Sequence, residues 1–313
     1  MVIEQLQGLH TIFTRRFLFN ALLPTLIFVS VDAAAVILFM DAWPTTSAWW
    51  GNLDLPSQAI LAISYLAAIW FLAVAVASQW RGIVRLYEGY PALALCSWLH
   101  IPAPGVTWHR DRLRTLQGSD PYSVYTYYPG QRYDDVLPTR LGNILRAAEK
   151  YPIDRYGIDP IIYWPRLYPF LPEAFQRDFE EFTRDYEFPL VVSILSLGSG
   201  VLCGVAALLT GQRPIVFIAV VVGLFAVAYG AYLVAIPGAV EMAEQQRVAF
   251  DLYRGLILEA WPTVEDVQDD GEAYEAITDF VVQNANPRWS AAQTRHRERS
   301  TGQQPPNPPD QGR

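Results

Sequence analysis

The sequence predicts an all-α membrane protein with four transmembrane helices, and three observations support this fold class. The chain has 313 residues, of which 52% are hydrophobic and only 17% are charged. The apolar residues are bunched into long runs, which is unusual for a soluble domain. Each run has about the 20 residues that a helix needs to cross a bilayer of roughly 30 Å. The four runs are 17–40, 59–78, 188–210 and 214–236.

The placement of arginine predicts which side of the membrane each loop faces. Arg15 and Arg16 precede the first run, Arg81 and Arg85 follow the second, and the loop 41–58 between them has no basic residue. Because basic loops stay in the cytoplasm, we expect both termini to be cytoplasmic. The expected regions are a cytoplasmic N-terminus (1–16), a first transmembrane hairpin (17–80), a cytoplasmic domain (81–187), a second hairpin (188–237), cytoplasmic C-terminal helices (238–285) and a disordered tail (286–313).

The polar regions predict a helical domain built on extensions of the spans in a 2+2 arrangement. Apolar residues at helical spacing and helix-starting prolines predict helices that include 139–150, 173–187, 238–261 and 272–283. Two segments are expected to be irregular or extended. In the tyrosine-rich stretch 122–128 the residue types alternate enough to predict an edge strand or an extended segment that covers a neighbouring element. His109 is expected in a solvated turn after the Pro/Gly-rich segment 101–106.

Small residues recur every four positions in the last two spans, which lets two helix backbones approach closely. We expect them to pack the two spans against each other in a tight hairpin, since only 211–213 separate the spans before Pro214. Contact between copies of the chain is the alternative. The candidate helix-packing residues are Ser196, Gly200, Gly204, Gly223, Ala226 and Gly230.

Asp32 is the ionisable residue that lies well inside a predicted span. A carboxylate in hydrocarbon is costly, so it usually faces a partner or a cavity. One interpretation is a proton or cation site. The other is a neutral aspartic acid that is hydrogen-bonded by Ser30, Ser64 or Tyr229, and the mostly apolar composition of the second and fourth spans favours it.

Four motifs resemble those of a group of bacterial multi-pass membrane proteins with a two-plus-two arrangement of spans. They are Arg-Leu-Tyr-Glu-Gly-Tyr at 85–90, Leu-Pro-Thr-Arg-Leu-Gly-Asn-Ile-Leu-Arg-Ala-Ala-Glu at 137–149, Tyr-Gly-Ile-Asp at 156–159 and Trp-Pro-Arg-Leu at 164–167. The similarity covers roughly 15–260. It implies the topology, a bacterial origin and therefore the inner membrane, and it implies no activity.

The motifs contain a dense set of polar side chains, which is the candidate partner- or ligand-binding site. It forms either a recognition surface or an Arg–carboxylate network that braces the helices, and the second interpretation is favoured. Its members are Arg140, Asn143, Arg146, Glu149, Asp159 and Arg166.

Several functions are excluded by what the sequence lacks. A net charge of −8 argues against nucleic acid as a partner. The four histidines and two cysteines show no metal-binding spacing, and no phosphate loop is present, so we expect no metal and no cofactor.

The sequence favours a non-enzymatic membrane protein that acts as a subunit, accessory or scaffold of a membrane assembly. Its expected partners are membrane lipids and either copies of itself or other membrane-protein subunits. A channel or transporter-like effector with Asp32 in its pathway, gated by the cytoplasmic domain, is the alternative. A membrane-embedded enzyme acting on lipids is disfavoured, because paired acidic motifs at the membrane face are missing.

Overall fold

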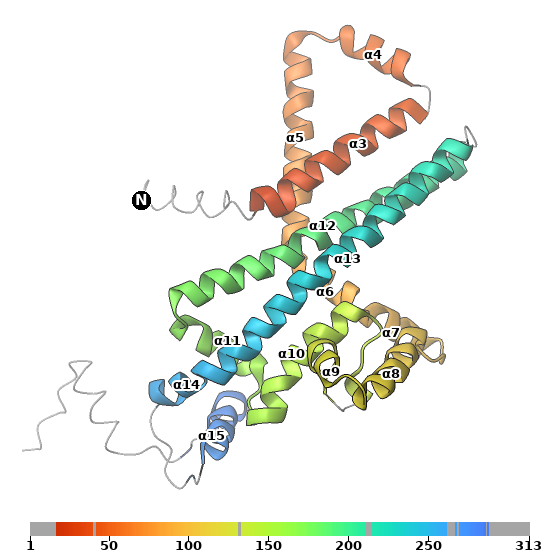
Figure 1. Ribbon diagram of the computed structural model, residues 1–313. Coiled ribbons are helices and arrows are strands. Elements are labelled where there is room, and N and C mark those ends of the chain that lie inside the picture. Colours follow the sequence, from red (N-terminus) through yellow and green to blue (C-terminus); the bar gives the residue numbers. More distant parts are fainter. Residues whose placement is uncertain are drawn as a thin grey trace, which may run out of the picture.

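A computed structural model describes residues 17–39, 42–130, 133–210, 214–261, 267, 269–285 and 287. Within these residues every regular element is a helix, which confirms the all-α prediction (Figure 1). In the part of the chain that the structure describes, four helical segments are long and apolar enough to cross a membrane: Leu18–Ile37, Leu55–Ser78, Glu173–Leu208 and Ile218–Tyr253. The predicted N-terminal region 1–16 and, except for Pro287, the predicted disordered tail 286–313 lie outside the described residues.

The helices follow one another with short connections. The N-terminal half contains η1 (Leu18–Leu22), α3 (Leu23–Phe39), α4 (Trp43–Gly51), α5 (Leu55–Ser78), α6 (Trp80–Glu88), α7 (Tyr90–Trp98), α8 (Pro104–Gln117) and α9 (Pro121–Tyr127). After η2 (Tyr133–Asp135) come α10 (Arg140–Tyr156), α11 (Pro160–Leu167), η3 (Tyr168–Phe170), α12 (Glu173–Thr210), α13 (Pro214–Tyr253), α14 (Gly255–Ala260) and α15 (Asp270–Gln283).

The two longest helices, α12 and α13, lie side by side and antiparallel (Figure 1). Both continue beyond their apolar part, as the sequence predicts, because neither Pro189 nor Pro237 ends the helix. A Cβ atom at Gly238 would lie 2.9 Å from the backbone nitrogen of Tyr186, so glycine is required where the two backbones come closest. This pairing provides the scaffold on which the other helices pack.

The first two apolar helices are arranged differently. Helix α3 packs on α12, whereas α5 diverges from α3 until α4 bridges them at the far end (Figure 1). Of the 24 residues of α5, only Ile69 and Ala73 are buried. Every residue from 59 to 68 is exposed, although the Tyr65 hydroxyl reaches Ser30 Oγ at 2.9 Å. The far half of α5 therefore has almost no packed face within the chain.

The expected strand or extended cover at 122–128 is wrong, because this segment forms helix α9. The Asp120 carboxylate accepts a hydrogen bond from the backbone N–H of Ser123 at 3.0 Å, and Pro121 occupies the first helical turn. An N-cap followed by proline is a helix-start signal that outweighs the apparent alternation of the tyrosines. His109 is likewise not in a solvated turn: it is buried in α8, which already begins at Pro104.

A hydrophobic core lies at the C-terminal end of α13. It contains Tyr163, Phe250 and Tyr274, and it joins α11, α13, α14 and α15. The predicted helix at 272–283 is confirmed as α15, whose Tyr274 and Ile277 are buried. The helical extensions of the spans are thus held together outside the apolar segments.

Candidate functional site

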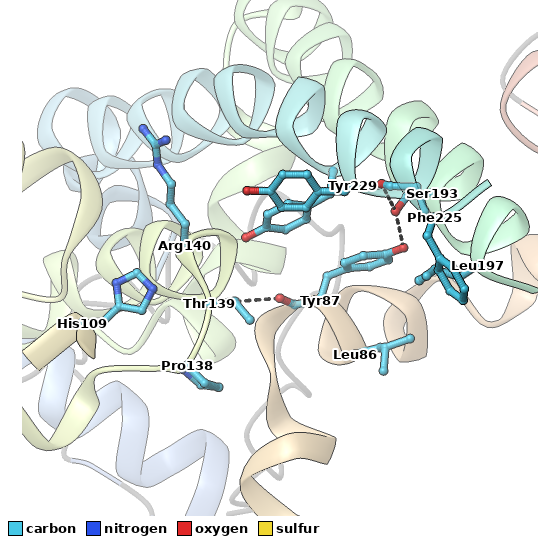
Figure 2. Close-up of a pocket in the computed structure, with 12 residues that line it drawn as sticks. Leu86, Tyr87, His109, Pro138, Thr139, Arg140, Ser193, Leu197, Phe225 and Tyr229 are labelled. Carbon is cyan, nitrogen blue, oxygen red and sulfur yellow. Dashed lines mark hydrogen bonds between the residues drawn. The ribbon is translucent and has the colours of Figure 1, made fainter. Parts of the chain in front are cut away.

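A cavity of about 420 Å³ lies where α6, α8 and the start of α10 meet the α12–α13 pair (Figure 2). We call it the junction pocket. One end is polar and carries Arg140 and His109, and the other end is apolar and carries Leu197 and Phe225 (Figure 2). Its lining residues are Leu86, Tyr87, His109, Pro138, Thr139, Arg140, Ser193, Leu197, Phe225, Ala228, Tyr229 and Tyr232.

Tyr87 fixes the wall between the two ends. Its hydroxyl donates to Ser193 Oγ at 2.6 Å, and Ser193 in turn donates to the carbonyl of Ala228 at 2.7 Å. The Tyr87 ring stacks on Tyr232, with ring centroids 5.9 Å apart. Burial raises the pKa of the Tyr87 phenol, so this hydroxyl remains a proton donor at neutral pH. The chain of bonds ties α6 to both helices of the long pair.

The floor of the junction pocket is set by the N-terminus of α10. Thr139 caps this helix by accepting from the N–H of Gly142 at 3.0 Å, and it donates to the carbonyl of Tyr87 at 2.6 Å. A Cβ atom at Gly142 would lie 2.6 Å from the carbonyl oxygen of Glu88, so only glycine lets α10 cross α6 this closely.

Asn143 holds the segment that leads into α10. It is fully buried, and its Oδ1 accepts from the Leu137 N–H at 2.8 Å. Its Nδ2 donates to the carbonyls of Leu137 and Thr139, each at 2.8 Å. Backbone groups that would otherwise be buried without partners are satisfied in this way. The side chain of Asn143 is therefore fully used in holding the backbone, and it does not line the junction pocket.

Arg140 supplies the positive charge of the junction pocket. Its guanidinium lies over the ring of Tyr127, 4.7 Å from the centroid, and its side chain is exposed. None of the carboxylates in the described ranges lies within ion-pair distance of it. Arg140 and Tyr127 also line a second cavity, together with Glu241.

His109 is neutral at physiological pH. Burial, together with the charge of Arg140, lowers its pKa to about 4. Its Nδ1 lies 3.1 Å from the hydroxyl of Tyr128, which connects α8 to the end of α9. The charge at the polar end of the pocket consequently comes from Arg140 and not from the imidazole.

The remaining candidate residues fall into separate places. Arg146 pairs with Glu149 at 2.8 Å and with Asp135 at 3.0 Å, and Lys150 also reaches Asp135 at 3.2 Å. Burial would raise the pKa of Asp135, but hydrogen bonds from both cations hold it below its ordinary value. This cluster matches the bracing interpretation for Arg146 and Glu149.

Asp159 and Arg166 act locally on α11. Asp159 caps this helix by accepting from the N–H of Ile161 at 2.9 Å, and Arg166 donates to the carbonyl of Ile162. The six polar candidates therefore do not form one surface, because α11 lies away from the junction pocket and Asn143 is buried beneath it.

Sequence reasoning missed a polar cluster between α9, α10 and α13. Arg247 is only 2% exposed; its Nη1 lies 3.1 Å from Glu244, and its guanidinium covers the ring of Tyr125 at 4.3 Å. The hydroxyl of Tyr125 donates to the other oxygen of Glu244 at 3.1 Å. Burial raises the pKa of Tyr125 to about 12. The Glu244–Arg247 spacing was visible in the sequence, but the tyrosine more than a hundred positions away was not.

Asp32 has a partner that the sequence did not predict. Ser199 of α12 donates to its carboxylate at 2.7 Å, whereas Ser30, one of the expected donors, bonds to Tyr65. Glu187 is a second acidic residue near a span that was overlooked. It is 4% exposed at the start of the apolar part of α12, where it lines a cavity of about 240 Å³ with Asn20 and Trp80.

The small residues divide between two faces. Gly200 faces α13, because a Cβ atom there would lie 3.5 Å from Leu224 Cβ, and Gly204 lies farther along, with Val221 at 4.0 Å. Ser196 is buried, and its hydroxyl donates to the carbonyl of Val192 in its own helix. Gly223, Ala226 and Gly230 do not serve the hairpin as expected. Gly223 and Ala226 are exposed, and a Cβ atom at either glycine would meet nothing within 4 Å. In α13, Ala228 and Ala235 make the contact with α12 instead.

Comparison of the chain with models of protein families, with curated proteins and with solved structures found no match.

Proposed function

We propose that this chain is a non-enzymatic, multi-pass membrane protein that acts as a subunit or scaffold of a membrane assembly. The assembly contains either further copies of the chain or other membrane-protein subunits. The four long apolar helices support the membrane location. The arginine distribution supports cytoplasmic termini and a cytoplasmic 81–187 domain in the bacterial inner membrane.

The observation that carries the assembly proposal is the exposed far half of α5. Ten consecutive residues, 59–68, are exposed, which means nearly three turns with no buried side on any face. Membrane helices associate through close van der Waals packing and interhelical hydrogen bonds. A span that packs on its own chain over only part of its length leaves this surface for a neighbouring helix.

The outward face of α13 offers a second contact surface. Ala226 and Gly230 are four residues apart on the side away from α12, with Gly223 one turn before. This spacing lets another helix approach the α13 backbone closely. We infer that α13 contacts α12 through Ala228 and Ala235 and a neighbouring subunit through Gly223, Ala226 and Gly230.

The substitution Gly230→Leu tests this surface. We expect it to reduce the mass of the purified assembly to that of a single chain, because leucine holds the two backbones apart. The fold of the chain should persist, since nothing within 4 Å of Gly230 would meet the new Cβ atom. Size-exclusion chromatography with light scattering in mild detergent measures the mass.

Gly198→Leu is the matched control. A Cβ atom at Gly198 would likewise meet nothing within 4 Å, but Gly198 lies on α12, so its replacement should leave the assembly intact. If Gly230→Leu left the mass unchanged, the outward face of α13 would not be the subunit contact.

A channel with Asp32 in its pathway remains the second proposal, and the Asp32–Ser199 pair is the observation that bears on it. A carboxyl group that accepts a hydrogen bond from Ser199 at 2.7 Å has a partner within the protein, which favours a structural role. We expect Asp32→Asn, which keeps the acceptor oxygen, to show the same ion flux as wild type in liposomes. Altered flux with an unchanged assembly mass would favour the channel instead.

A further inference from the structure

We propose that the junction pocket binds an anionic membrane phospholipid, with the phosphate on Arg140 and part of an acyl chain between Leu197 and Phe225. This inference goes beyond the assembly role and rests on different residues. The cavity of about 420 Å³ lies within the range of pockets that hold small ligands. It is suited to one headgroup and part of one chain.

The two ends of the pocket match the two parts of a lipid. Leu197 and Phe225 belong to the apolar helices that are long enough to cross a membrane, so this end lies at the level of acyl chains. Arg140 begins α10, outside those helices, where a headgroup would lie. Figure 2 shows these residues at opposite ends of the pocket.

The charge distribution selects an anion. The Arg140 guanidinium lies over Tyr127, at the rim that the junction pocket shares with a second cavity lined by Tyr127, Arg140 and Glu241. It pairs with none of the described carboxylates, and its planar donors are suited to a phosphate at this rim. The N-terminus of the 17-residue helix α10 adds a partial positive charge at the same place. The neighbouring His109 adds no charge at neutral pH.

The surface beside the polar end is suited to the membrane interface. Trp98 of α7 and Trp108 of α8 are 72% and 62% exposed, and the Trp108 ring lies 4.6 Å from that of His109. Leu95, Leu99 and Ile101 are exposed on the same segment. Exposed tryptophans among apolar side chains are typical of proteins at the headgroup level of a bilayer. This surface therefore supports a position of the polar end of the pocket at the headgroup level.

Native mass spectrometry of the full-length protein in detergent tests the proposal. The probes are dioleoyl phosphatidylglycerol, dioleoyl phosphatidylcholine and inorganic phosphate. We expect Arg140→Gln to weaken phosphatidylglycerol binding roughly tenfold, the effect of losing one charged hydrogen bond. Arg140→Lys should retain part of the affinity. Arg81→Gln is the matched control, because Arg81 is also exposed near the end of a span but does not line the pocket.

The apolar end is tested by Leu197→Trp, which fills it. We expect this variant to weaken binding of both lipids, whereas Arg140→Gln affects mainly the anionic one. Equal affinities for Arg140→Gln and Arg81→Gln would overturn the proposal. Inorganic phosphate that displaces phosphatidylglycerol at millimolar concentration would also overturn it, since the site would then hold a free anion. If Leu197→Trp lowers stability, the phosphatidylglycerol affinities of Arg140→Gln and Arg140→Lys are compared instead. The proposal requires the lysine variant to bind more tightly than the glutamine variant.

Discussion

Replacing Asn143 by leucine should destabilise the region outside the spans by about 3–4 kcal/mol. The leucine has a similar size but leaves the N–H and C=O of Leu137 buried without partners. Each such group costs roughly 1–3 kcal/mol. Denaturant unfolding of the full chain in mild detergent, followed by circular dichroism, measures the change.

Hydrogen exchange gives a local readout for the same variant. The amide of Leu137 should exchange much faster in Asn143→Leu than in wild type, because its acceptor is gone. Asn52→Leu is the control: Asn52 is exposed beyond the end of α4, so its replacement should change stability by less than about 0.5 kcal/mol. A stable Asn143→Leu protein with a protected Leu137 amide would contradict the assigned role of Asn143.

Replacing Glu244 by alanine should cost more stability than replacing its partner Arg247 by methionine. Arg247 is 2% exposed, while the Glu244 side chain is 44% exposed. Removing the glutamate leaves a buried cation over the rings of Tyr125 and Tyr151 without its ion-pair partner, at a cost of about 2–3 kcal/mol. Removing the arginine leaves a carboxylate that water can solvate, and methionine fills much of the space. That variant should lose about 1 kcal/mol, mainly the contact with Tyr125.

The order of the two variants is the informative result. Unfolding midpoints of wild type, Glu244→Ala and Arg247→Met are measured side by side, with Glu241→Ala as an exposed control on the same helix. If Arg247→Met is the less stable of the two, then the cation is needed for more than its ion pair, and water must reach it in the folded chain.

Chain composition was sufficient to predict the long apolar helices and several helix boundaries. The starts of α10 and α12 were predicted from Pro138 and Pro172, and the structure adds Thr139 as the N-cap of α10. Such signals are local, because capping side chains and prolines act within one turn. The same local chemistry was present in Asp120, Pro121 and Ser123 and predicts α9 correctly. The regular recurrence of tyrosines led to the opposite interpretation there. Local start signals were therefore more reliable than short-range alternation in this chain.

The contacts that build the candidate sites could not be predicted in the same way. Ser199 lies 167 positions from Asp32, and Ser193 lies 106 positions from Tyr87. These pairs depend on how the helices pack, which no local pattern encodes. Both faces of α13 carry small residues, so the sequence does not distinguish them. The packing shows that Ala228 faces α12 while Gly230 faces outward.

The mass of the protein extracted from native membranes without detergent, in polymer-bounded lipid discs, tests the assembly proposal most directly. One chain has a mass of 35.3 kDa. We predict that mass spectrometry after release from the discs finds a defined multiple of this mass or a stoichiometric complex with another membrane protein. A single 35.3 kDa chain accompanied only by lipid would contradict the account.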